Sequence, residues 1–412
     1  MSLEKQTRQD ITLDEQVVRL AQQVVGLAEV SRFYGSNPEY IVAGGGNTSC
    51  KDKNFLFIKP SGTSMDKIKA EDFVKMDRAS LGAIWNKNYP SDTDAREAAV
   101  LSDMMASRCP GQERRPSVET LLHDILPFTF VVHTHPALVN GLTCSVEGEA
   151  AAKRLFPGSL WIPLINPGYI LSKAVWDALN ALRAKDSAAL ASNVVIFLQN
   201  HGIFVAANSI EEINKIYEKV MKTLGGYVKR TPDFREAGSP AAFNTGLPGS
   251  LFPTESFELG KSWNIGNMIL ETAGKYKPDS EWFIKSGNNN QIAAFTANRA
   301  AFRPVSSAFT PDHIVYSGSD PLFIEDASCL EEVFISHAEK TRIPKIIAIQ
   351  GIGVFALGNS ERAVENALDA FFDTVKIAVF SESFGGPLFM YDEMIRFINN
   401  WEVERYRSSV AS

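Results

Sequence analysis

The segment Phe128-Thr-Phe-Val-Val-His-Thr-His135 decides the fold of this chain, because it joins a strand pattern to two candidate metal ligands. Its β-branched and aromatic residues are typical of a strand that is buried in a sheet. Side chains two positions apart in a strand point to the same face, so His133 and His135 can bind one ion. The segment therefore predicts a metal site that is built on a strand.

Two residues outside this segment complete the candidate site. His201 lies in the polar middle of a second strand-like run, 194–205, and Glu119 lies in a segment, 116–126, with the pattern of a helix start. Each has an ordinary explanation as well, since a lone histidine is more often a hydrogen-bonded residue and a helix dipole favours an acid in the first turn. Three imidazoles with one open position are nevertheless typical of a catalytic zinc site.

Length and composition limit the possible classes of protein. A chain of 412 residues and 45.3 kDa is long enough for two domains. The net charge of -7, without a block of lysine and arginine, predicts no nucleic-acid partner. The scattered cysteines, the absence of a signal-peptide pattern and the lack of a long apolar run predict a cytoplasmic protein that does not enter a membrane.

Strand-like and helix-like runs intermingle along the chain without a regular βαβ alternation, which predicts a layered α/β sandwich with a mixed sheet. We assign residues 1–230 to this metal-binding domain. Residues 231–255 are dense in glycine, proline and serine and are predicted to form a linker. Residues 256–412 are then a second, smaller α/β domain.

The second domain repeats the first one faintly. The alignment sets residues 197–209 against 348–360 and, more weakly, 130–135 against 314–319. Ile352 stands opposite His201 in this alignment, so a second copy would be free of metal. Chance similarity between apolar strands that precede helices explains the match as well as a duplication does.

Three small-residue segments offer hydrogen-bond donors to an anionic ligand. They are the loop Gly44-Gly-Gly-Asn-Thr-Ser49, which lies between strand-like runs at 40–43 and 54–58, the turn Ser61-Gly-Thr-Ser64, and Ser117 at the predicted helix start. Ordinary turn and capping chemistry explains each segment taken alone. Their occurrence together with the histidines favours an anionic substrate.

Five motifs, in this order, resemble those of the class II aldolase/adducin family of sugar-phosphate enzymes. They are Gly46-Asn-Thr-Ser49, Lys59-Pro-Ser-Gly62, Pro116-Ser-Val-Glu119, Val131-Val-His-Thr-His135 and Gln199-Asn-His-Gly202. Later segments are similar to the aldolase part of bifunctional rhamnulose-1-phosphate aldolase/lactaldehyde dehydrogenase proteins. The resemblance implies an α/β/α sandwich around a mixed, largely antiparallel sheet.

The resemblance also implies a site and a reaction. His133, His135 and His201 would bind Zn²⁺ or another divalent metal, and Glu119 would be the catalytic proton carrier. The implied phosphate and substrate ligands are Gly46, Asn47, Thr48, Ser61, Gly62 and Ser117. The implied reaction is zinc-dependent retro-aldol cleavage of a ketose 1-phosphate, of the rhamnulose- or fuculose-1-phosphate type, to dihydroxyacetone phosphate and a short aldehyde, in a homo-oligomer.

One departure from the family pattern concerns the substrate. Val118 stands where fuculose-phosphate aldolases have a second serine for phosphate, so the requirement for phosphate is less firmly implied than the metal. Two alternatives remain open. The first is a sugar-phosphate 4-epimerase of the same family, which shares the histidines but resembles a pattern with aspartate at the position of Glu119. The second is an adducin-like scaffold, which has the fold without the metal histidines.

Overall fold

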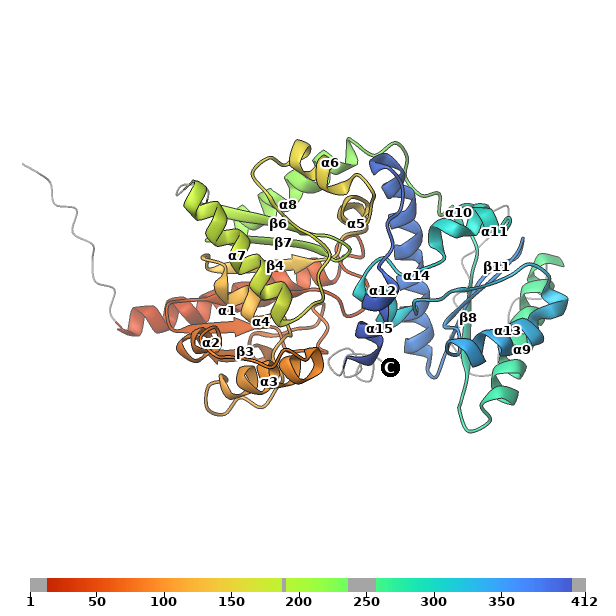
Figure 1. The fold of residues 1–412 in the computed structure, drawn as a ribbon, viewed down its shortest axis with the longest axis horizontal. Helices are drawn as coiled ribbons and strands as arrows, with labels where there is room; N and C mark the ends of the chain where they lie inside the picture. Colours follow the sequence, from red (N-terminus) through yellow and green to blue (C-terminus); the bar gives the residue numbers. More distant parts are fainter. Residues whose placement is uncertain (1–12, 187–189, 236–256, 402–412) are drawn as a thin grey trace, which may run out of the picture.

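Two sheets, each covered by helices on both faces, make up the structure (Figure 1). This computed structural model describes residues 13–186, 190–235 and 257–401. The linker predicted at 231–255 therefore lies for the most part outside the described residues. Within the described ranges, no helix combines the length and the apolar character that a bilayer crossing requires.

The first sheet has seven strands in the order β3-β2-β1-β4-β7-β6-β5. The strands are β1 (Asn47–Lys51), β2 (Phe55–Ile58), β3 (Val74–Asp77), β4 (Phe130–Thr134), β5 (Leu160–Ile162), β6 (Asn193–Leu198) and β7 (Gly202–Ala207). Every neighbouring pair is antiparallel except β5 and β6, which run parallel. The predicted mixed, largely antiparallel sheet is confirmed.

Helices cover both faces of this sheet. One face packs on α1 (Leu13–Gly35), α5 (Ala137–Thr143), α6 (Gly148–Leu155) and α8 (Ile210–Gly225). The other packs on α2 (Arg78–Ile84), α3 (Thr93–Ala106), α4 (Thr120–Ile125) and α7 (Tyr169–Lys185), and a short 3-10 turn, η1 (Ala70–Asp72), precedes β3. Successive strand residues point to opposite faces: Val132 packs in the core on the side of α1 and α8, and Val131 packs in the core on the side of α4 and α7. The predicted three-layer sandwich is confirmed.

The strand expected at 40–43 is wrong: Tyr40 and Ala43 lie in turns, the two residues between them are irregular, and Ala43 has a left-handed backbone, with φ at 54°. The strand β1 instead occupies Asn47–Lys51 and overlaps the segment 44–49 that was expected to be a loop. All five β1 residues are buried although most are polar, since their side chains find partners: Thr48 bonds to Ser31, and the Lys51 ammonium donates to the His123 carbonyl.

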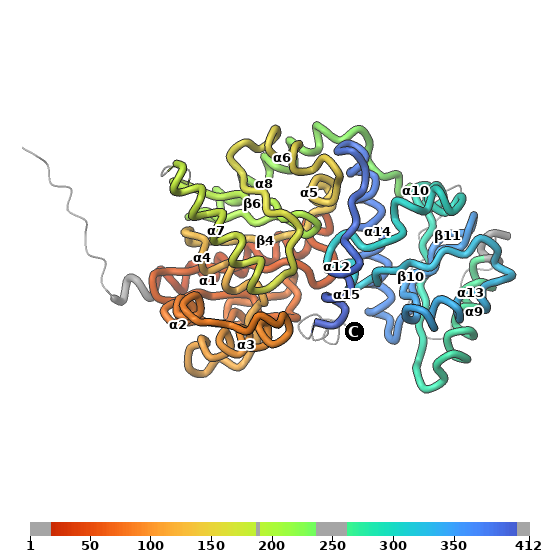
Figure 2. The backbone as a smooth tube through the Cα atoms, viewed as in Figure 1, coloured from red at the N-terminus to blue at the C-terminus, as the bar shows by residue number. Residues whose placement is uncertain are grey.

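The second sheet has four strands in the order β8-β11-β10-β9, namely β8 (Phe283–Gly287), β11 (Gly353–Gly358), β10 (Ile346–Ile349) and β9 (Leu322–Ile324). It lies between α9 (Phe257–Tyr276) and α13 (Leu330–Lys340) on one face, and α10 (Asn290–Phe295), α11 (Arg299–Phe302) and α14 (Glu361–Ser381) on the other. Three 3-10 turns complete this unit: η2 (Arg303–Val305), η3 (Ala327–Cys329) and η4 (Glu382–Phe384). Helices α12 (Pro311–Tyr316) and α15 (Asp392–Asn400) lie between the two units (Figure 2).

The second sheet repeats part of the first in order and direction. The series β8-β11-β10-β9 has the same two antiparallel pairs and one parallel pair as β4-β7-β6-β5. Ser286 pairs with Phe355 as His133 pairs with Phe204, so a serine takes the place of that histidine. The duplication and the absence of a metal site from a second copy both stay predictions.

The weaker part of the predicted repeat, 130–135 against 314–319, is wrong. Residues up to Tyr316 belong to the helix α12, not to a strand. The helix forms here because the Thr310 hydroxyl caps it by accepting from the backbone NH of His313, and because proline is well tolerated at the first helical position. The strand that corresponds to β4 in the topology is β8.

Helix α14 connects the two units. One of its faces covers the second sheet, and another packs against α5 of the first unit, within one shared apolar core. The two helices approach closely because Gly141 of α5 has no side chain; a Cβ there would overlap the Cβ of Phe380. The interface between the units is therefore apolar and close-packed.

Candidate metal centre

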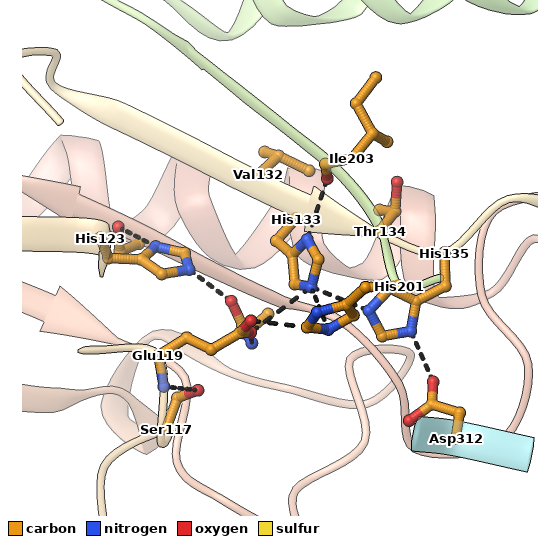
Figure 3. A network of polar contacts seen from close by, with 12 residues as sticks. Ser117, Glu119, His123, Val132, His133, Thr134, His135, His201, Ile203 and Asp312 are labelled. Atoms are coloured by element: carbon orange, nitrogen blue, oxygen red, sulfur yellow. Dashed lines mark hydrogen bonds and ion pairs between the residues drawn. The ribbon is translucent and has the colours of Figure 1, made fainter. Parts of the chain in front are cut away.

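Three histidine rings meet at the end of β4 and the adjoining β6–β7 turn (Figure 3). His133 lies within β4 and His135 just beyond it. His201 is in the turn, which is tight because Asn200 adopts φ 54°, a conformation that asparagine tolerates better than most residues. The turn comes alongside His133 and His135 because β4 pairs with β7, with Thr134 opposite Ile203.

The ring nitrogens are close enough to share one ion. The Nε2 atom of His133 lies 2.8 Å from that of His135 and 3.4 Å from that of His201. One ligand atom from each of the three residues lies within 4.8 Å of the others. The three predicted ligands are therefore brought together, and they form a group that could hold a metal ion.

Hydrogen bonds behind two of the rings determine their tautomers. The Nδ1 atom of His133 is 2.9 Å from the carbonyl oxygen of Ile203, and that of His135 is 2.5 Å from Oδ2 of Asp312. A carbonyl and a carboxylate can only accept, so both Nδ1 atoms carry the proton and both Nε2 atoms present lone pairs to the cluster. Two Nε2 atoms at 2.8 Å need a proton or a metal ion between them, and with both Nδ1 atoms used elsewhere this donor set fits a metal.

His201 is electrically neutral, as a metal ligand must be. Burial, ahead of the opposing attraction of Glu119 and the repulsion of the other two imidazoles, lowers the pKa of His201 to about 3. At neutral pH this ring therefore offers a lone pair to a metal and does not need to lose a proton first.

Glu119 lies beside the histidines, where it precedes α4. Its Oε2 atom accepts a hydrogen bond of 2.6 Å from the Asn47 amide and lies 3.4 Å from Nε2 of His133. Its Oε1 atom lies 3.6 Å from Nε2 of His201, is buried, and has no hydrogen-bond partner among the described residues. An unsatisfied buried carboxylate oxygen that faces a metal-ligand cluster is a candidate for proton transfer.

A buried hydrogen-bond network behind Glu119 was not predicted from the sequence. The His123 ring bonds to the Ser49 hydroxyl through Nδ1, at 2.7 Å, and to the Asn47 carbonyl oxygen through Nε2. Burial first, and then the Lys51 charge, holds the pKa of His123 well below its usual range, so the ring is neutral. It orients the Asn47 amide with its NH₂ toward Glu119. His123 follows Glu119 by four residues, and that helical spacing was the only available signal.

A small pocket, open to solvent, adjoins the histidines and Glu119. Its lining residues are Gly44, Gly46, Asn47, Lys59, Ser61, Gly62, Ser117, Val118, Glu119, His135, Pro167, His201 and Pro311. Of the predicted substrate ligands, Thr48 alone is missing from this lining. Side chains alternate along β1, so Asn47 faces the cavity and Thr48 bonds to Ser31 on the opposite side.

The two serine-bearing loops are joined by a short backbone bridge. Ser61 donates its NH to the Arg115 carbonyl at 2.9 Å, and Ser117 donates its NH to the Lys59 carbonyl at 3.2 Å. These NH groups are therefore used within the protein, and the two hydroxyls remain as donors toward the cavity. The buried Lys59 also lines this cavity; it lies in the motif Lys59-Pro-Ser-Gly62, but no sequence signal marked it as a substrate ligand.

Comparison with known proteins agrees with this geometry. Residues 26–225 match the model of the Class II Aldolase and Adducin N-terminal domain. The uncharacterized oxidoreductase YuxG of Bacillus subtilis (strain 168) is 21% identical over an alignment of 436 positions that takes in 96% of this chain. The chain spans 60% of the length of that relative.

Two solved structures are also similar. The N-terminal class II aldolase domain of a conserved protein from Thermoplasma acidophilum is 22% identical, with 55% of this chain and 97% of that one covered and a TM-score of 0.41. The L-fuculose-1-phosphate aldolase of Thermus thermophilus is 14% identical, with 49% and 92% covered and a TM-score of 0.32. The match at residues 26–225 shows that this chain contains a class II aldolase/adducin family domain, and its histidine cluster lies within that domain.

Proposed function

We propose that this chain is a metal-dependent carbon–carbon lyase that cleaves a ketose 1-phosphate of the rhamnulose or fuculose type into dihydroxyacetone phosphate and a short aldehyde. The observation that carries the proposal is the convergence of three imidazoles beside the unsatisfied Oε1 of Glu119, at the wall of an open cavity. A scaffold has no chemical need for this combination.

The metal would be Zn²⁺ or another divalent ion, held by His133, His135 and His201. When bound, such an ion polarises substrate oxygens and stabilises negative charge that develops next to them. Three imidazole ligands would leave a divalent ion able to accept a substrate oxygen, and two of them, His135 and His201, line the cavity.

Glu119 would carry the proton. In the cleavage direction the bond between C3 and C4 of the sugar breaks, the C4 hydroxyl loses its proton as it becomes the aldehyde, and C3 gains a proton. Asn47 holds Oε2, so Oε1 is the atom that is free to deliver a proton to C3. A positioned carboxyl group of this kind typically contributes about 10²–10⁴-fold to a rate.

The anionic end of the substrate would bind at Lys59 and at the hydroxyls of Ser61 and Ser117, which line the cavity together. An ammonium and two hydroxyls match phosphate oxygens in charge and hydrogen-bonding capacity. Lys59 is the one lysine or arginine among the described residues that line the cavity. Val118 contributes no hydroxyl, which makes Lys59 more important here than it would be beside two serines.

The test is a screen of ketose 1-phosphates for release of dihydroxyacetone phosphate and aldehyde, with metal-loaded protein and with chelator-treated protein. Glu119→Gln is the matched control, because it keeps shape and removes the proton carrier. Metal-dependent release by the wild type, absent in the variant, would support the proposal. Formation of a C4 epimer without free aldehyde would instead show an epimerase, and purified protein without metal or turnover would favour a scaffold.

A further inference from the structure

Asp312, in the first turn of helix α12 of the second unit, contacts the metal centre. Asp312 is 177 positions from His135 in the chain, yet its Oδ2 lies 2.5 Å from Nδ1 of that histidine. Both side chains are largely buried, with exposed fractions of 12% for Asp312 and 10% for His135. In Figure 3 the Asp312 carboxylate enters from α12 and points at the His135 ring.

The glycine loop of the first unit makes room for this approach. A Cβ at Gly45 would overlap the Asp312 carboxylate, and a Cβ at Gly44 would come within 2.5 Å of the Tyr316 hydroxyl. We expected these glycines to expose NH groups to a ligand. Gly44 and Gly46 do line the cavity, so that expectation stays a prediction, and the structure adds a second reason for the glycines: Gly44 and Gly45 leave space for α12, and Gly46 has a left-handed φ of 68°.

Helix α12 is held firmly by its own unit. His313 accepts from the Phe309 NH through Nδ1, at 3.3 Å, and so donates from Nε2 to Asp373 of α14, at 3.1 Å. At the other end of the helix, the half-buried Lys345 ammonium donates to the Val315 carbonyl at 2.5 Å. These contacts fix the direction in which Asp312 points.

A second contact from this unit supports the turn that carries His201. The side-chain amide of Asn200 donates to the carbonyl oxygens of Phe309, at 3.0 Å, and Leu388, at 2.7 Å. Both carbonyls belong to the second unit. Two of the three histidines are therefore held, directly or through their turn, by residues that lie beyond the family match at 26–225.

We propose that the second unit completes the metal centre, with Asp312 as a positioning residue for His135 and the Phe309 and Leu388 carbonyls as anchors of the His201 turn. The proposal rests on the metal site of the proposed function. A carboxylate that accepts from the non-ligating nitrogen fixes the ring orientation and increases electron donation from the ligating nitrogen. Loss of such a partner typically weakens metal affinity by about 10–100-fold.

The experiment compares three variants of the full chain. Asp312→Asn keeps the shape and removes the negative charge next to His135. Asn200→Gly keeps the left-handed turn, which glycine tolerates, and removes both anchoring bonds. Glu339→Gln is the matched control, since it removes an acidic charge at an exposed position of the same unit.

Affinity for Zn²⁺ is measured by competition with a chelating dye, and the visible spectrum of bound Co²⁺ reports ligand geometry. We expect Asp312→Asn to bind Zn²⁺ about 10–100-fold more weakly and to change the Co²⁺ spectrum, and Asn200→Gly to lose about 10-fold. Glu339→Gln should match the wild type. The melting temperature of each metal-free variant shows whether it is folded, and Asn200→Gly carries the test if Asp312→Asn does not fold.

Wild-type affinity and an unchanged Co²⁺ spectrum in folded Asp312→Asn would overturn the proposal. These readouts separate it from the proposed reaction, because a protein that binds metal in this way but cleaves no ketose 1-phosphate would refute the lyase and leave the role of Asp312 intact. A wild-type protein that binds no divalent ion would overturn both.

Discussion

Replacing Glu119 by glutamine should stabilise the metal-free protein while it abolishes the proposed reaction. In the metal-free protein Oε1 of Glu119 is buried without a hydrogen-bond partner among the described residues, while Oε2 accepts from Asn47. A glutamine can keep its carbonyl oxygen on the Asn47 amide. Its NH₂ group then takes the place of Oε1, 3.6 Å from Nε2 of the neutral His201 ring, and can donate to that nitrogen after a small rotation.

The size of the effect follows from the unsatisfied atom. A buried polar group without a partner costs about 1–3 kcal/mol, and Glu119→Gln removes that cost. In a unit of this size each kcal/mol changes the melting temperature by about 2–4 °C, so we expect a rise of at least about 2 °C in the metal-free protein. The cleavage rate should fall about 10²–10⁴-fold, because the amide cannot deliver the proton.

Differential scanning calorimetry of chelator-treated protein measures the stability, and aldehyde release measures the rate. Glu97→Gln is a suitable control, because Glu97 is also buried but both its oxygens are hydrogen-bonded, to the Tyr169 NH at 3.1 Å and to Arg96 at 3.2 Å. That variant should be destabilised. A melting temperature for Glu119→Gln that falls as it does for Glu97→Gln would refute the reasoning from the unsatisfied oxygen, and wild-type activity would exclude Glu119 as the proton carrier.

Three further predictions concern the metal, the anion and the pH. His201→Ala should lose bound zinc, as measured by elemental analysis of the purified protein, and unchanged metal content would remove His201 from the site. Lys59→Met should raise the KM for a phosphorylated substrate about 10–100-fold, the equivalent of one charge-assisted hydrogen bond, with a smaller change in kcat; an unchanged KM would place the phosphate elsewhere. Burial lowers the pKa of Lys51 to about 7. Between pH 7 and the ordinary lysine pKa, the unfolded chain therefore binds more protons than the folded one, and the free energy of unfolding rises with pH. The wild type should therefore gain up to about 1.4 kcal/mol per pH unit in this window relative to Lys51→Met, and parallel urea-unfolding curves for the two proteins across pH 7 to 9 would contradict this.

The parts of the site that the sequence reveals are those that local periodicity encodes. His133 and His135 stand two apart in an apolar strand, and the turn at His201 interrupts a second apolar run that pairs with it, so both signals are short-range. The fold class followed from the same runs. By contrast β1 is buried and polar, and its burial depends on Ser31, His123 and Glu119, which are distant in the chain. No apolar pattern marks such a strand.

The contacts between the two units could not be predicted from the sequence for the same reason. Nothing in the residues around Asp312 indicates that its carboxylate meets His135, because the contact depends on how α12 and α14 pack on the first unit. The glycines of the 44–46 loop were recognised as unusual, but their reason is a neighbour that is far away in sequence. Sequence patterns identify the ligands here, and only tertiary packing identifies what holds them.

Because helix α14 packs on both units, the family domain and the cooperatively packed structure do not end at the same residue. The family match ends at residue 225. Helix α5 begins two residues after His135, and its apolar surface packs against α14, which starts at residue 361. A stretch of chain that shows no trace of the metal motif thus contributes to the rigidity of the ligands. Substitutions along α14 can change the behaviour of the centre without touching it, so the pair of sheets is the unit to keep intact in engineering.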